Sequence, residues 1–326
     1  MSSTRPLDPV YFGKLPTRGD FVRSGSSRPS VRALDDWLQR GLHHAKTRQP
    51  RAFERAFDDA LACCFFFSPR EVPGALIGVM QPSRDRSGRR YPFLIALDAG
   101  GRQFKARQLA HVPVQMGAFF EQAHTLAQRV VNGDLQADDL LDRLDAATLS
   151  NRSDTAPVRD YKRYLRQTPL KRLWEQLWVH PDGARKHLLI KKLIDVLQPF
   201  REHLPARLSY GLQFPLGDEH PAGPYTTSFW WETCFRLLGF PDTTPTCFWP
   251  APSEDPPSRR PAMLFFLRPP PVGAFASLFA DERDSDAVYP LDGRADPGGA
   301  SPALPDSYED LLDDDQRTLW SFLRRL

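Results

Sequence analysis

The sequence predicts an α/β protein, in which a mixed β-sheet is flanked by helices and a second α+β half follows. Two observations favour this class. Short apolar and aromatic runs alternate with longer segments of helical spacing, and 41% of the 326 residues are hydrophobic, which is enough for a large core. We expect an N-terminal α/β domain over residues 1–150, a helical and α+β half over residues 158–280, and an acidic, largely disordered tail over residues 281–326.

The first region is predicted to run helix, helix, strand, strand, strand, helix. Val31, Leu34 and Leu38 recur at helical spacing after Ser30, the expected N-cap, and the strands are short apolar runs. A sheet with helices packed on it follows from this order. In chain order, the elements occupy residues 30–42, 53–61, 63–67, 75–80, 91–97 and 114–130, with a further helix over 138–149 and a linker over 151–157.

The second region opens with a basic segment, residues 159–207, which carries a net charge of +7. Pro169 and residues 181–183 break it into about three helices. The pattern then changes to short aromatic and apolar runs. We predict strands over residues 208–214, 246–249 and 263–267, and helices over residues 227–238 and 272–280.

The tail is acidic, because residues 281–315 carry a net charge of −10 and few large apolar side chains. Such a composition is typical of disordered chain, although residues 319–323 are apolar enough to dock. The opposite charges suggest that the tail covers the basic segment and so hides a surface used by a partner. The simpler interpretation is that both segments are solvated faces.

Composition argues against several classes of protein. The overall net charge of +3 is too small for a nucleic-acid-binding protein, for which a large excess of basic residues is expected. No apolar run resembles a signal peptide or a membrane-spanning helix. We therefore expect a soluble protein of the reducing cytoplasm, without direct membrane insertion, in which all four cysteines are buried thiols. They are Cys63, Cys64, Cys234 and Cys247.

No motif for catalysis, metal binding or cofactor binding is visible. The eight histidines lack ligand spacing, and neither G-x-S-x-G nor G-x-G-x-x-G occurs. Gly13-Lys14 lacks both the upstream glycine and the hydroxyl residue of a P-loop. We expect no catalytic residue, no metal and no cofactor, and hence a protein that is not an enzyme.

Residues 10–22 form the most unusual stretch, with aromatic and apolar ends around a polar middle. Gly13, Pro16 and Gly19 restrict the backbone to a defined path. The polar middle is therefore predicted to be a loop presented by two buried flanks. We expect Gly19 to adopt a positive φ and Asp20 to pin the loop. The alternative is that the loop contacts a partner.

A second polar loop follows the strand predicted over residues 75–80. Asp85 is expected to accept hydrogen bonds from the loop backbone or from Arg89, and so to shape the turn into the next strand. Alternatively, Arg86, Arg89 and Arg90 form a basic patch that meets an acidic partner. The residues that define the turn are Pro82, Ser83, Gly88 and Pro92.

Both loops resemble a known family. The stretch Gly-Lys-Leu-Pro-x-x-Gly-Asp-Phe-Val over residues 13–22 is similar to a signature of the TagF family, whose members are associated with type VI secretion. Residues 78–93 resemble a second signature, Gly-Val-x-x-Pro-Ser-x-Asp-x-x-Gly-Arg-x-Pro. Trp37-Leu38 matches the first helix of the family, and residues 214–216, 229–230 and 247–249 resemble its C-terminal half.

The resemblance implies a longin-like N-terminal domain and a post-translational regulator of a bacterial virulence machine. The resemblance to TagF implies a repressor that binds a cytoplasmic forkhead-associated scaffold protein of the type VI secretion system. Two alternatives are an enzyme acting on a small anionic or phosphorylated ligand held by Lys14, Arg18 and Arg89, and a structural component of the apparatus. The candidate partner-binding residues are Lys14, Arg18, Asp20, Asp85, Arg86 and Arg89.

Overall fold

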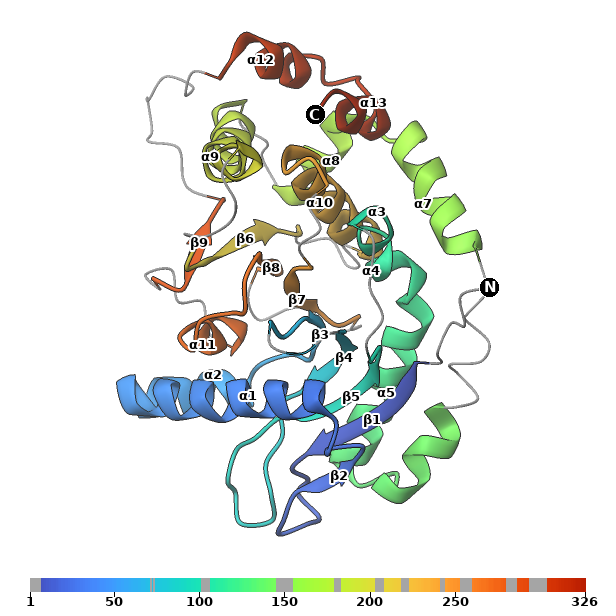
Figure 1. The fold of residues 1–326 in the computed structure, drawn as a ribbon, viewed down its shortest axis with the longest axis vertical. Coiled ribbons are helices and arrows are strands. Elements are labelled where there is room, and N and C mark those ends of the chain that lie inside the picture. The colour runs from blue at the N-terminus through green and yellow to red at the C-terminus, as the bar shows by residue number, and fades with distance from the viewer. Residues whose placement is uncertain are drawn as a thin grey trace.

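The structure is a computed structural model of the chain (Figure 1). It describes residues 7–70, 72, 74–100, 106–144, 155–178, 183–202, 208–217, 223–240, 244–252, 260–279, 286–292 and 304–326.

One continuous sheet of nine strands runs through the molecule in the order β2-β1-β5-β4-β3-β7-β8-β6-β9. All neighbours pair antiparallel except β6 and β9, which pair parallel, so the predicted mixed sheet is confirmed. The strands are β1 (Asp8–Gly13), β2 (Val22–Ser24), β3 (Cys63–Phe67), β4 (Leu76–Gln81), β5 (Phe93–Asp98), β6 (Gly211–Pro215), β7 (Thr246–Pro250), β8 (Ala262–Phe266) and β9 (Val288–Pro290).

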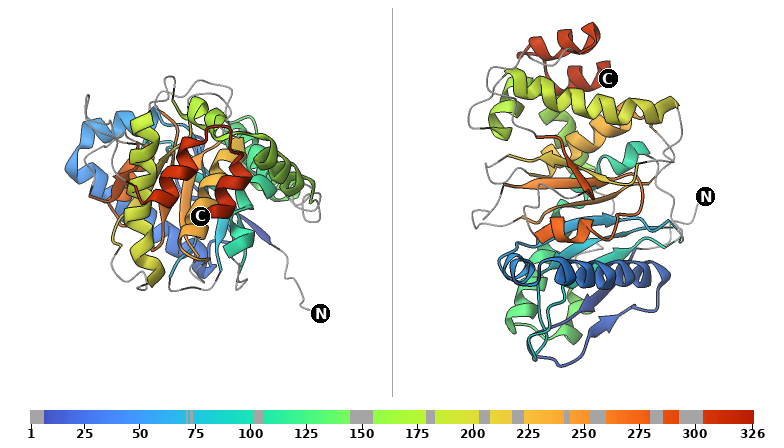
Figure 2. Two further views of the ribbon diagram at one scale, coloured as in Figure 1. Left: turned by 90° about the horizontal axis from the view of Figure 1, so that it is seen from above. Right: turned by 90° about the vertical axis from the view of Figure 1, so that its left-hand side faces the viewer.

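Helices cover both faces of this sheet (Figure 2). The helices are α1 (Pro29–Arg48), α2 (Pro50–Asp58), α3 (Ala106–Leu109), α4 (Val112–Gln115), α5 (Gly117–Asn132), α7 (Ala156–Gln167), α8 (Leu170–Leu177), α9 (Gly183–Glu202), α10 (Gly223–Leu237), α11 (Ala274–Phe279), α12 (Asp306–Asp313) and α13 (Leu319–Arg325), with a 3₁₀ turn, η1 (Ala137–Asp139), after α5. Residues 140–144 are helical as well.

Alternation along the strands separates two apolar cores. Phe65 and Phe67 of β3 point to the face covered by α1, α2 and α11, whereas Phe66 between them joins the core under α5 and α10. The core under α5 and α10 also includes buried residues of α7, α8, α9 and α13, so it is the larger of the two cores. Because β3 is apolar on both sides, it must lie inside the sheet with both faces covered.

The two halves of the chain meet at the pairing of β3 with β7. Cys63 lies opposite Pro250 and Phe66 opposite Cys247. The second half therefore extends the sheet of the first half. The division into regions at residues 150 and 158 remains a prediction, and residues 145–154 lie outside the described part.

Three local predictions need correction. The sequence predicts no strand ahead of residue 63, whereas residues 8–13 form β1 and residues 22–24 form β2, so the predicted loop between them is a hairpin connection. The predicted long helix is divided at Met116. Ser30 is not the N-cap of α1, since Arg28 occupies that position and the Ser30 hydroxyl instead donates to Asp98 Oδ1 at 3.0 Å.

The predicted docking of residues 319–323 is confirmed, and α12 forms in the same described part of the tail, residues 304–326. The expectation of a largely disordered tail otherwise concerns residues 281–303, most of which lie outside the described part. Leu319, Phe322 and Leu323 of α13 are buried against the larger core, and Thr318 caps this helix by accepting a hydrogen bond from Ser321 N. Charge did not prevent folding because the apolar residues recur on one helical face. The predicted contact with the basic segment exists, since Lys186 Nζ of α9 lies 2.9 Å from Asp315 Oδ1. The idea that the tail hides a partner surface remains a prediction.

Among the described residues, no helix is long and apolar enough to span a membrane.

Candidate functional site

The loop between β1 and β2 and the loop between β4 and β5 lie side by side at one end of the sheet. They meet because β5 pairs antiparallel with both β1 and β4, which places Phe12 opposite Leu94 and Gln81 opposite Phe93. The end of β1 and the start of β5 are therefore neighbours. We call residues 14–24 and 82–90 the two-loop tip. In Figure 1 it lies at the end of the molecule opposite α12 and α13.

A buried ion pair joins the two loops. Lys14 Nζ lies 2.8 Å from Asp85 Oδ2, and the two side chains are 9% and 0% exposed. Breaking a buried pair of this kind leaves one charge without a partner in a poorly solvated position. The pair therefore fixes the loops relative to each other.

Asp85 also organises its own turn, as predicted. Its Oδ1 accepts hydrogen bonds from the backbone N–H of Ser87 and Arg89 and from the Ser87 hydroxyl, and Arg89 Nε donates to Oδ2 at 2.7 Å. Burial alone would raise the pKa of the Asp85 carboxyl. The hydrogen bonds from Lys14, Ser87 and Arg89 outweigh burial and hold this pKa well below its ordinary value. Asp85 is therefore a charged carboxylate that shapes the turn.

Hydrogen bonds to backbone oxygens complete the brace between the loops. The Ser83 hydroxyl donates to Lys14 O at 2.7 Å, Arg86 N donates to Arg18 O at 2.9 Å, and an Arg89 guanidinium N–H donates to Gly19 O at 2.9 Å. Each bond crosses from one loop to the other, so these bonds fix the position of the two loops relative to each other.

An aromatic cluster supports the tip from below. The Phe21 ring stacks on Phe12 at 5.2 Å with 7° between the planes, and meets the edge of Tyr91 at 4.9 Å. The Lys14 ammonium lies 5.2 Å from the centre of the Phe21 ring. Tyr91 is itself anchored, because its hydroxyl donates to Asp35 Oδ1 at 2.6 Å. The predicted burial of Phe21 is wrong, since 37% of it is exposed.

The glycines of the tip behave differently from one another. Gly13 has φ +143°, and a Cβ there would lie 2.3 Å from Pro92 O, so this position requires glycine. Gly88 has φ +83° in the turn that Asp85 shapes. Gly19 does not adopt a positive φ, contrary to prediction. The hydrogen bond from Arg89 to Gly19 O therefore holds a backbone whose φ residues other than glycine can also adopt.

Some of the predicted site residues are buried beneath the tip, and others are exposed on its surface. Lys14, Ser83, Asp85 and Pro92 are buried, whereas Arg18, Asp20, Arg86 and Arg89 are exposed. Asp20 makes no side-chain hydrogen bond within the described part, so its predicted pinning role is not seen. Pro16 and Pro82 are half-buried at the ends of the loops.

Sequence reasoning missed three exposed side chains of the tip: Phe21, Arg23 and Arg84. The concentration of arginine in both loops was the available signal. Together the two loops contain seven basic and two acidic residues, a net charge of +5.

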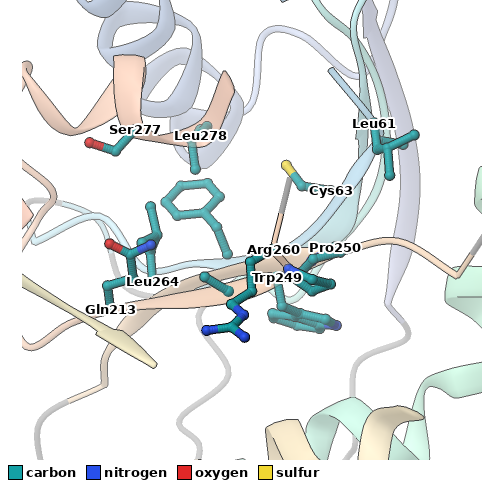
Figure 3. Close-up of a pocket in the computed structure, with 13 residues that line it drawn as sticks. Leu61, Cys63, Gln213, Trp249, Pro250, Arg260, Leu264, Ser277 and Leu278 are labelled. Carbon is teal, nitrogen blue, oxygen red and sulfur yellow. The ribbon is translucent and has the colours of Figure 1, made fainter. Parts of the chain in front are cut away.

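A small cavity lies near the middle of the sheet, between β3, β7, β8 and α11 (Figure 3). Its lining includes Cys63, Trp249, Arg260 and Ser277. Its volume of about 50 Å³ is far below the ~300–1,000 Å³ of ordinary ligand pockets. Cys63 is half-buried, whereas Cys64, Cys234 and Cys247 are fully buried. Burial raises the pKa of these three thiols well above the ordinary value. Within the described ranges, no cluster of His, Cys, Asp and Glu is placed to hold a metal ion.

These features define the class: an α/β protein with one continuous mixed sheet, whose N-terminal half presents a braced, basic two-loop tip. Residues 10–147, which include the whole tip, match a family model described as the TagF N-terminal domain, type VI secretion system-associated. The N-terminal part of the chain therefore carries a TagF N-terminal domain, of the kind associated with type VI secretion.

One solved structure that this chain is similar to is the crystal structure of PA0076 from Pseudomonas aeruginosa PAO1. The two chains share 17% sequence identity and superpose with a TM-score of 0.45, over 91% of this chain and 100% of that chain. No curated protein matches the sequence.

Proposed function

We propose that this chain is a post-translational regulator that represses type VI secretion by binding a cytoplasmic forkhead-associated scaffold protein of the machine. One observation carries the proposal. The two stretches that resemble the family signatures, although about 70 residues apart in the chain, form one braced surface. A surface held by a buried ion pair and crossing hydrogen bonds loses little conformational freedom on binding, which favours a recognition role.

In this proposal, the candidate partner-binding residues act in two ways. Arg18, Asp20, Arg86 and Arg89 are exposed and contact the scaffold protein. Lys14 and Asp85 are buried and support the contact surface from below.

The experiment is deletion of the gene with secretion as the readout. Loss of a repressor raises secretion of the type VI substrates, and purification of the tagged chain from secreting cells recovers the scaffold protein. Reduced secretion after deletion would instead favour a structural component of the apparatus. Unchanged secretion with no recovered scaffold would contradict the proposal.

The alternative of an enzyme with a small anionic ligand finds less support. That ligand was expected to contact Lys14, Arg18 and Arg89. The Lys14 ammonium is already bound to Asp85, and Arg89 Nε binds the same carboxylate. A further anion would have to displace these bonds.

A further inference from the structure

We infer that the two-loop tip recognises an acidic protein segment that carries an apolar side chain, with arginines binding the carboxylates and Phe21 receiving the apolar group. The inference rests on the proposed function and specifies the chemistry of the partner. We call the exposed arginines of the tip that are not bound to Asp85 the arginine rim; they are Arg18, Arg23, Arg84 and Arg86.

The apolar part of the recognition surface is Phe21. It is the exposed large hydrophobic residue of the described chain. Its ring cannot turn freely, because it is stacked on Phe12 and meets the edge of Tyr91, both of which are buried. An aromatic ring that is partly exposed but held from below costs little entropy when a partner covers it. It is therefore a suitable anchor for an aliphatic or aromatic side chain.

The arginine rim supplies the charge. Arg84 and Arg86 make no side-chain hydrogen bond or ion pair with any described residue, so their planar donor groups remain available. The backbone of Arg86 is nevertheless fixed by its bond to Arg18 O. Arg18 faces Asp138 only at 4.0 Å, with both side chains exposed. Guanidinium groups bind carboxylates in a two-pronged geometry, which suits an acidic peptide.

The distribution of charge favours a protein segment over other anionic partners. The tip concentrates a net charge of +5 on two short loops. The other basic region, residues 159–207, lies in the other half of the chain, where ion pairs such as Lys186–Asp315 and Arg185–Asp292 offset part of its charge. The far end of the molecule also carries the acidic residues of α12 (Figure 1). A nucleic acid or a lipid surface needs positive charge over a broad face, whereas an acidic segment needs only a short basic strip beside one apolar contact.

The test measures binding of purified, full-length chains to the purified forkhead-associated scaffold. The key variant is Arg84→Glu/Arg86→Glu. Its matched control is Arg324→Glu/Arg325→Glu, which makes the same charge change on exposed arginines of α13 at the far end. We expect the tip variant to weaken binding about 10-fold or more and to flatten its salt dependence, while the control binds like the parent.

A second variant tests the apolar anchor. Phe21→Ala should weaken scaffold binding about 10-fold with little change in salt dependence. Because Phe21 also packs on Phe12 and Tyr91, the melting temperature of the Phe21→Ala protein is measured in parallel. Phe21→Leu keeps an apolar contact and should restore most of the affinity.

A peptide probe separates failure of this inference from failure of the proposed function. The probe is a labelled synthetic peptide of alternating Asp and Glu with one central Leu, and its control has Asn and Gln in place of the acids. If the scaffold does not bind the parent chain, the proposed function fails, and rim-dependent binding of the acidic probe would still support the inference.

Three outcomes overturn the inference. The first is scaffold binding that is equal for the tip variant and the parent, which leaves the proposed function intact. The second is equal weakening by the tip and control variants, which indicates general charge attraction. The third is rim-dependent binding to vesicles containing an anionic phospholipid with no binding to the acidic probe, which identifies a membrane-facing surface.

Discussion

Two carboxylates in different halves of the chain each gather several cationic partners, yet they do so in different ways. Asp85 is fully buried and receives two backbone N–H groups, one hydroxyl, Lys14 and Arg89. Asp292 is 16% exposed and, among the described residues, receives hydrogen bonds from side chains only. Its donors are the Trp178 indole at 3.1 Å, the Arg185 guanidinium at 3.0 Å and the Arg260 guanidinium at 3.2 Å.

The comparison separates a carboxylate that shapes a turn from one that ties distant segments together. Most donors to Asp85 come from the next four residues, so the turn cannot form properly without it. The three donor residues of Asp292 lie 32 to 114 positions away in the chain, and all three bind the same partly exposed carboxylate. Loss of one partner is therefore tolerated better at Asp292 than at Asp85.

The largest effect should follow from Asp85→Asn. This change leaves Lys14 buried without a counter-charge and weakens the turn. Asp292→Asn keeps an acceptor for the indole and leaves two arginines that water can reach. Chemical denaturation of both variants should show a clearly larger loss of unfolding free energy for Asp85→Asn. Equal losses would mean that burial of the carboxylate does not distinguish the two sites.

The pH dependence sharpens the same comparison. The pKa of Asp85 in the folded protein is well below its ordinary value of 3.8. The charged form therefore stabilises the fold fully above that value, and this contribution is lost as the pH falls below it. The stability difference between the parent and Asp85→Asn should stay constant above about pH 5 and shrink below about pH 4. Denaturation at several pH values checks this, and a difference that grew on acidification would contradict it.

A smaller effect, confined to the backbone of the tip, should distinguish Gly13 from Gly19. Gly13→Ala forces a methyl group against Pro92 O and Phe93 Cα at a positive φ. We expect a loss of about 2–4 kcal/mol. Gly19→Ala meets only the Arg86 guanidinium at 3.6 Å and should change stability by less than about 0.5 kcal/mol. Melting curves of the pair test this contrast, which fails if both variants behave alike.

The smallest effect should come from Arg260→Ala. Its guanidinium is 39% exposed, and Arg185 and Trp178 continue to bind Asp292 after its loss. An exposed ion pair of this kind contributes about 0–1 kcal/mol. A loss well above that range would show that Arg260 is essential to the group around Asp292.

Sequence reasoning anticipated the tip better than the group around Asp292. Spacing and turn residues predicted that Asp85 would accept bonds from its own loop, because those donors are only two to four residues away. The resemblance located both loops. Nothing in the sequence paired Lys14 with Asp85, since 71 residues separate them and their meeting depends on the pairing of β1 with β5.

By itself, the sequence determined the α/β class, the strands β3 to β8 and most helices, because these depend on spacing within a few residues. It also determined the turn around Asp85. Only the tertiary structure decided that β3 pairs with β7 to make one sheet, that α12 of the acidic tail packs on the core, and that Phe21 stays partly exposed. Those outcomes depend on contacts between residues far apart in the chain, for which local pattern holds no information.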